Sequence, residues 1–160
     1  MKRGDRRVIT SGMFLGGGLG GFVDGFVLHQ ILQWHEMISS VLPPVTVVAM
    51  KVNMLWDGVF HAFAWTMTLI GVLFLASAAN APREVPVMRP LLSSMLIGWG
   101  MFNVIEGLID HQILGLHHVH PGSAQLAWDA AFLAVSMLLV VLGTSILVRT
   151  FKVPHLQPAH

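Results

Sequence analysis

Four long apolar runs dominate this sequence and restrict the chain to a helical membrane fold. Each run reaches the roughly 20 residues that an α-helix needs to cross a bilayer. Only 11% of the residues are charged and 54% are hydrophobic, whereas roughly a quarter of a soluble domain is charged. We therefore expect an all-α fold, an integral membrane four-helix bundle, with its helices within residues 8–32, 55–79, 91–114 and 126–148.

Basic residues precede the first apolar run, as they do in a signal peptide. The run is too long for a typical signal core and carries Asp24 and His29, so we expect it to remain as a membrane helix. The chain contains no cysteine, which excludes disulfides and thiolate metal sites. Residues 1–160 are expected to form a single membrane domain whose partner is the lipid bilayer, with no nucleic-acid partner.

The positions of the basic residues predict the topology of the chain. Cytoplasmic loops of membrane proteins carry an excess of lysine and arginine. Apart from Lys51, all basic residues lie in the N-terminal tail, the connection between the second and third runs, or the C-terminal tail. We therefore expect a multi-pass protein of a bacterial inner (plasma) membrane with cytoplasmic N and C termini. The residues that set this orientation are Lys2, Arg3, Arg6, Arg7, Arg83, Arg89, Arg149 and Lys152.

One sequence motif occurs twice, 82 positions apart. Residues 24–35 read Asp-Gly-Phe-Val-Leu-His-Gln-Ile-Leu-Gln-Trp-His, and residues 106–117 read Glu-Gly-Leu-Ile-Asp-His-Gln-Ile-Leu-Gly-Leu-His. Trp-Asp-Gly-Val-Phe at 56–60 likewise corresponds to Trp-Asp-Ala-Ala-Phe at 128–132. A duplication of this kind predicts two tandem, pseudo-symmetric helical hairpins, about 8–79 and about 91–148. Sites in such proteins often lie where the repeats meet.

The first run is rich in glycine, with four-residue spacings such as Gly16/Gly20 and Gly17/Gly21. Small residues at this spacing allow two helices to approach closely. We expect this face to pack against a neighbouring helix or against a partner in a homo-oligomer.

Acids and histidines concentrate at one end of the expected bundle. At about 100° per residue, Asp24 shares a helix face with His35, and Glu106 shares one with His117, if both helices stay regular. Carboxylates and imidazoles that converge in a helical bundle are typical of metal sites, and ionisable groups inside a membrane are usually functional. We expect the metal ligands to come from Asp24, His29, His35, Asp57, His61, Glu106, Asp110, His111, His117, His118 and Asp129.

The spacing does not identify the metal. The Glu-x-x-His pattern of soluble di-iron bundles is absent, and Fe, Cu, Zn and Mn all accept such ligands. Met54 lies on one helical stripe with Asp57 and His61, and its thioether would suit Cu(I). Haem is a minority alternative, with His29 and His111 as opposing axial ligands.

Histidines beyond residue 117 are weaker candidates for metal ligands. His118 and His120 lie in the last connection and could serve as entry ligands, whereas His155 and His160 in the C-terminal tail are expected to be incidental.

Two further interpretations of the whole cluster remain open, a proton or ion relay and purely structural polar packing.

Three motifs of the chain, Asp-Gly-x3-His-Gln-Ile-Leu-x2-His, Trp-Asp-Gly-x-Phe-His and Glu-Gly-x2-Asp-His-Gln-Ile-Leu-x-Leu-His-His, resemble those of a bacterial family of small four-helix membrane proteins of unknown function. The resemblance covers nearly the whole chain and implies the fold and the membrane location. It also implies an association with cytochrome oxidase assembly and copper handling, and hence with a respiratory membrane complex.

The preferred hypothesis is a membrane protein with a His/carboxylate metal site near the outer leaflet. It would act as a metalloenzyme, an oxidoreductase or a hydrolase, on an apolar substrate. The first alternative is a metal-handling or respiratory oxidase assembly factor related to copper or haem. The second is a proton or ion relay or a transporter, which is disfavoured because residues 69–76 and 135–142 are almost wholly apolar where a path through the membrane would need polar groups.

Overall fold

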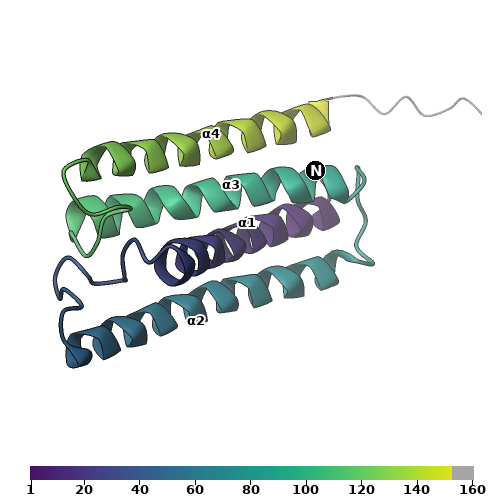
Figure 1. Cartoon of the computed structure of the whole chain (residues 1–160). Coiled ribbons are helices and arrows are strands. Elements are labelled where there is room, and N and C mark those ends of the chain that lie inside the picture. Colours follow the sequence, from purple (N-terminus) through teal and green to yellow (C-terminus); the bar gives the residue numbers. More distant parts are fainter. Residues whose placement is uncertain (153–160) are drawn as a thin grey trace, which may run out of the picture.

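The computed structural model describes residues 1–152 and contains four long helices joined by loops (Figure 1). All four are long and apolar enough to cross a membrane. Over the described residues the chain is all-α, which confirms the predicted four-helix membrane fold. In chain order the elements are α1 (Arg3–Val23) with its continuation η1 (Asp24–Ile31), α2 (Val47–Ala78), α3 (Met88–Glu106) with its continuation η2 (Gly107–Ile113), and α4 (Gln125–Lys152).

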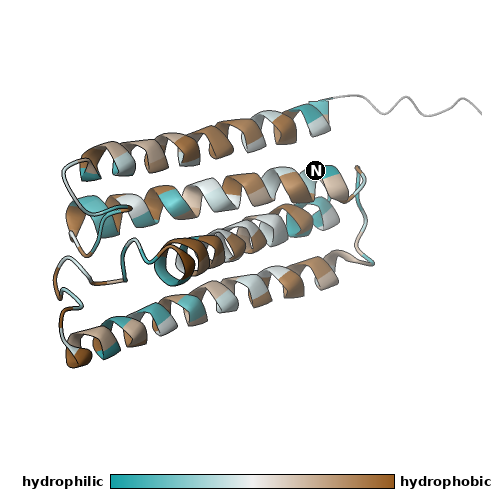
Figure 2. Cartoon of the chain, in the orientation of Figure 1, coloured by the Kyte–Doolittle hydropathy of each residue, from teal (hydrophilic) through white to brown (hydrophobic). Residues whose placement is uncertain are grey.

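Helices α1 and α3 form the centre of the bundle. They pack against each other, α2 packs on the outer side of α1, and α4 packs on the outer side of α3 (Figure 1). Half of the most apolar stretch of α1 is buried, against 11% of that of α4. The hydrophobic residues that predominate along α4 (Figure 2) therefore face the lipid, and the two central helices carry most of the interior.

The glycine-rich face of α1 lies inside the chain. A Cβ atom at Gly12 would lie 2.6 Å from the Leu91 carbonyl oxygen, and one at Gly16 would collide with the Met95 backbone of α3. The missing side chains thus let the two central backbones approach closely. The structure therefore shows the first of the two expected uses of this face, packing against a neighbouring helix, and a homo-oligomer would need a different surface.

Helix α2 begins earlier than the apolar run near residue 55 suggests. It starts at Val47, and the Oγ1 of the preceding Thr46 accepts a hydrogen bond of 3.1 Å from the backbone N–H of Ala49. A side-chain acceptor at this position satisfies one of the free N–H groups of the first turn. The cap explains why residues 47–54, which include the polar Lys51 and Asn53, are already helical.

Helices α1 and α3 both end in a π-helical segment and then reverse direction. Gln33 and Gly115 follow these segments and have φ angles of 51° and 57°, a left-handed conformation that commonly stops a helix. The expectation that His35 and His117 continue a regular helix face is therefore wrong. Both histidines lie on loops, and the left-handed turn returns each of them to the bundle.

The two ends of the bundle differ in their role. One end, which we call the terminal end, holds the N-terminus and the connection from α2 to α3 (Figure 1). There the buried Asp5 accepts hydrogen bonds from the backbone N–H groups of Lys2 at 2.9 Å and Glu84 at 3.1 Å. The opposite end, the site end, holds η1, η2 and the starts of α2 and α4.

Candidate metal centre

Four histidines meet at the site end, and each is nearly inaccessible to solvent. His29 comes from η1, His111 from η2, and His35 and His117 from the loops that follow. Their exposed fractions range from 1% to 6%. The ring centroids of His29 and His35 are 4.4 Å apart, those of His111 and His117 are 4.7 Å apart, and those of His35 and His117 are 4.6 Å apart.

Backbone carbonyl groups hold the two loop histidines. The Nδ1 of His35 lies 2.9 Å from the carbonyl oxygen of Val119, and the Nδ1 of His117 lies 2.9 Å from that of Met37. A carbonyl oxygen can only accept, so Nδ1 carries the proton in both rings. In each ring Nε2 is the atom left to bind a ligand.

A carboxylate lies beside the Nδ1 atom of each helical histidine. The Nδ1 of His29 donates to Oδ1 of Asp57 over 2.9 Å. The Nδ1 of His111 lies 3.4 Å from Oδ1 of Asp129 and makes no hydrogen bond. A partner on one ring nitrogen fixes the ring and directs the other nitrogen, which is how metal-binding histidines are usually oriented.

Two further buried carboxylates face the Nε2 atoms. Glu106 Oε1 lies 3.1 Å from Nε2 of His117 and 3.2 Å from Nε2 of His111. Asp24 Oδ2 lies 3.4 Å from Nε2 of His29. Among the described residues, the buried Nε2 of His35 and Oε2 of Glu106 make no hydrogen bond. Buried polar atoms without a partner are rare in proteins and often mark a ligand or ion site.

The ligand atoms form two overlapping groups. His29, His35 and His117 make one group, and Glu106, His111 and His117 make the other, with the atoms of each group within 4.8 Å of one another. Two ligand atoms of a tetrahedral zinc ion with bonds of 2.0–2.1 Å would be about 3.4 Å apart. The donor atoms of each group would therefore have to move closer together to bind one ion.

Burial and neighbouring groups shift the pKa values of two loop residues, His35 and Glu36. Burial, together with the neighbouring His117 and His29 rings, lowers the pKa of the His35 imidazole to about 2, so the ring is neutral. Burial, with the negative charge of Asp57, raises the pKa of the Glu36 carboxyl above its usual value. A neutral imidazole is the form that binds a metal.

The two halves of the site correspond position by position. The backbone N–H of Met37 donates to Asp57 Oδ1 over 2.9 Å, and that of Val119 donates to Asp129 Oδ1 over 3.0 Å. Each of these loop residues also offers its carbonyl oxygen to a histidine of the other half, as described above. The loops thereby cross the interface between the halves and tie the cluster together.

The halves differ at the position after the second histidine. Glu36 stands in the first half, and His118 stands at the corresponding position of the second. The Nδ1 of His118 lies 2.7 Å from Oδ2 of Asp129, and Gln112 donates to the same oxygen over 3.1 Å. The site is therefore asymmetric in charge although its backbone repeats.

Six residues expected among the ligands lie outside the two groups of ligand atoms: Asp24, Asp57, His61, Asp110, His118 and Asp129. His61 donates from Nδ1 to the backbone carbonyl of Asp57 over 2.7 Å, and its Nε2 would be 2.7 Å from a Cβ atom at Gly25. Asp110 is only partly buried and lines an apolar cavity beside the cluster. His155 and His160 lie outside the described residues.

Several groups that contact the site residues were not among the candidates predicted from the sequence. The carbonyl groups of Met37 and Val119 carry no sequence signal because any residue has a carbonyl group. Glu36 and Gln112 could have been found from the repeat, since each adjoins or belongs to one of the duplicated motifs.

The fold and the buried cluster together define a class of protein, a polytopic helical membrane protein with histidines and carboxylates gathered at one end of the bundle. The chain belongs to a family of predicted membrane proteins of unknown function, DUF2243, whose family model matches residues 11–150. Searches of curated proteins and of solved structures found no significant match.

Proposed function

We propose that this protein binds a transition metal between its two halves. The ligands are the Nε2 atoms of four histidines together with two carboxylates, and Asp57 and Asp129 orient the histidines from behind. The buried Nε2 of His35, which has no hydrogen-bond partner, carries this proposal. The proposed ligands are His29, His35, His111, His117, Asp24 and Glu106.

The competing interpretations explain less of the geometry. Structural polar packing would satisfy each polar atom within the protein, yet the buried Nε2 of His35 is left without a partner. A relay needs polar groups that continue towards the terminal end. The buried Ser11, Ser93 and Ser94 lie in that direction, but their hydroxyl groups donate to backbone carbonyl oxygens.

The ligand chemistry favours Fe, Cu or Zn, since imidazole nitrogen suits all three and carboxylate oxygen suits Fe and Zn well. A thioether site for Cu(I) is disfavoured because Met54 is 65% exposed on the outer face of α2. Haem is also disfavoured. The rings of His35 and His117 stack between the two halves, in the space that a porphyrin between His29 and His111 would need.

We further propose that the two halves arose by duplication and that the site end faces the outside of a bacterial inner membrane, with both termini cytoplasmic. In this setting the metal would polarise or activate a small molecule such as water or dioxygen. Asp110 and Glu36 lie beside the cluster and could exchange protons with it. An oxidoreductase or hydrolase that acts on an apolar substrate is the preferred role, and a metal-handling or oxidase assembly factor is the alternative.

The proposal is tested by elemental analysis of the detergent-purified chain. We expect a stoichiometric transition metal in the wild type and its loss in the double variant His29→Ala/His111→Ala. The matched control His61→Ala/His120→Ala also removes two imidazoles but leaves the cluster intact. Wild-type protein that takes up no metal, even when Fe, Cu or Zn is supplied, would contradict the proposal.

A further inference from the structure

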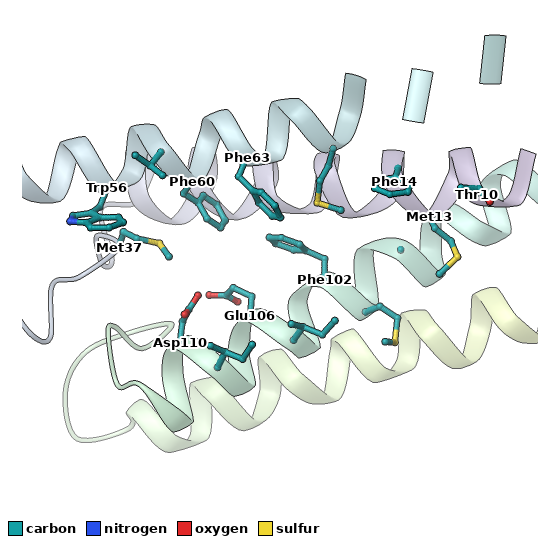
Figure 3. A pocket seen from close by; sticks show the side chains of 16 residues that line it. Thr10, Met13, Phe14, Met37, Trp56, Phe60, Phe63, Phe102, Glu106 and Asp110 are labelled. Carbon is teal, nitrogen blue, oxygen red and sulfur yellow. The ribbon is translucent and has the colours of Figure 1, made fainter. Parts of the chain in front are cut away.

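An apolar groove opens on the side of the bundle and ends at the candidate metal centre. Its volume is about 740 Å³, within the range of pockets that hold small molecules. Helices α2 and α3 form its walls and α1 forms its floor (Figure 3). The exposed fractions of Phe63 and Ile105, 55% and 51%, show that its mouth faces the lipid.

The polarity of the groove is confined to its ends. Phe60, Phe63 and Phe102 line its middle, and Thr10 lies at the far end (Figure 3). At the site end the carboxylates of Glu106 and Asp110 lie close together (Figure 3). The groove is therefore shaped for a molecule with a long apolar part and one polar end.

The length of the groove matches one leaflet of a bilayer. Its lining runs from Trp56 to Met67 on α2 and from Gly98 to Asp110 on α3 and η2. At 1.5 Å per residue these stretches are about 16–18 Å long, close to half of the roughly 30 Å hydrocarbon core. Trp56 stands at the polar end, where tryptophan is enriched at membrane interfaces. A single hydrocarbon chain of one leaflet would match the groove in length.

The chemistry of the polar end selects the head group. Glu106 Oε2 is buried without a hydrogen-bond partner, and Glu106 lines the groove. An ionised carboxylate can only accept hydrogen bonds. A head that donates a hydrogen bond without carrying negative charge would satisfy this atom, whereas an anionic head would be repelled by both acids.

We propose that the groove between α2 and α3 binds a single-chain lipid with a hydroxyl head, and that Glu106 and Asp110 receive the hydroxyl group. Binding of the chain does not depend on a bound metal. The placement of the head beside a reactive centre, which would make this molecule the substrate, rests on the proposed metal-binding function.

Photolabelling of the full chain in lipid nanodiscs tests this site. The probes are a long-chain primary alcohol with a diazirine in mid-chain and the fatty acid with the same chain and diazirine. Mass spectrometry then maps the labelled peptides. We expect the alcohol to label α2 within residues 56–67, and α3 and η2 within residues 98–109, in preference to the largely lipid-facing stretch 135–142 of α4. Excess unlabelled alcohol should compete and excess phospholipid should not.

One matched pair of variants and two further single variants sharpen the test. Ile105→Trp places an indole in the groove, whereas Val23→Trp places one at the corresponding exposed position of α1, outside the groove. We expect only Ile105→Trp to abolish the groove labelling, and Met101→Trp serves as a second groove variant. Asp110→Asn should narrow the preference for alcohol over acid by about tenfold, the effect of one hydrogen bond to a charged acceptor.

Labelling spread evenly over all lipid-facing helices, or competed equally by phospholipid, would overturn the proposal. Equal labelling by alcohol and acid would overturn the assigned head group. Metal content is measured on the same samples. Groove labelling without metal would contradict only the metal centre, and metal without groove labelling would contradict only the lipid site.

Discussion

His35 and His117 stack face to face, with ring centroids 4.6 Å apart and an angle of 7° between the ring planes. The carbonyl oxygen that orients each ring belongs to the loop of the other half, Val119 for His35 and Met37 for His117. Neither half can hold its own loop histidine without the other. This exchange makes the proposed metal centre a property of the interface between the halves.

The carboxylates behind the helical histidines should tune metal affinity. Asp57→Asn and Asp129→Asn keep the size of the side chain but remove the negative charge beside Nδ1 of His29 or His111. Loss of such a partner typically weakens metal binding about 10–100-fold. Competition with a chelator of known affinity measures the effect, and Glu84→Gln at the terminal end serves as the control. Unchanged metal affinity in both variants would show that the two carboxylates do not orient the histidines.

The close approach of α1 and α3 should be sensitive to side-chain size. In Gly16→Leu the new side chain meets the Met95 backbone of α3, and we expect a loss of at least about 1–3 kcal/mol. A Cβ atom added at Gly58 on α2 would meet no neighbouring atom within 4 Å, so Gly58→Ala should stabilise the helix by about 0.5–1 kcal/mol. Thermal unfolding in detergent compares the two variants. Equal stability would show that the helices do not pack as described.

The two left-handed turns that direct the loop histidines back to the bundle should differ in their tolerance of substitution. Gly115 has a φ of 57°, so Gly115→Ala should cost about 1–2 kcal/mol and weaken metal binding by displacing His117. Gln33 adopts nearly the same conformation with a φ of 51°, so Gln33→Gly should be tolerated. Metal content and unfolding temperature report both effects. A greater loss in Gln33→Gly than in Gly115→Ala would contradict the assigned backbone conformation.

A bound metal should stabilise the fold. At a free concentration one hundred times the dissociation constant, a metal that binds only the folded chain adds about 2.7 kcal/mol. We expect the unfolding temperature of the wild type to rise with the added metal and fall with a chelator. The His29→Ala/His111→Ala variant should show neither shift, and a shift of the same size in that variant would place the metal elsewhere.

The sequence predicted the fold because long apolar runs admit few alternatives in a bilayer. The repeated acids and histidines also indicated which end of the bundle is polar. The contacts at that end depend on the backbone conformation, which the sequence pattern did not indicate. The regular-helix assumption failed at Asp24 and His35 because the π-helical segment and the left-handed Gln33 change the direction of the chain.

The roles of individual candidates were harder to predict for a related reason. Asp57 and His61 are one helical turn apart, yet Asp57 faces His29 while His61 turns back to the backbone carbonyl of Asp57. Spacing along one helix places side chains on a face but does not show which partner the opposite helix brings. The lateral groove was likewise hidden, because side chains of several helices form it and the spacing along one helix does not show how the helices meet.

The central claim is that one metal centre is shared by both halves, and it is tested most directly by metal stoichiometry in two half-site variants. His29→Ala/His35→Ala removes the histidines of the first half, and His111→Ala/His117→Ala removes those of the second. Circular dichroism checks that both variants remain helical. We predict that either variant loses most of its metal, because each half completes the other. A full or half complement of metal in either variant would contradict a shared centre.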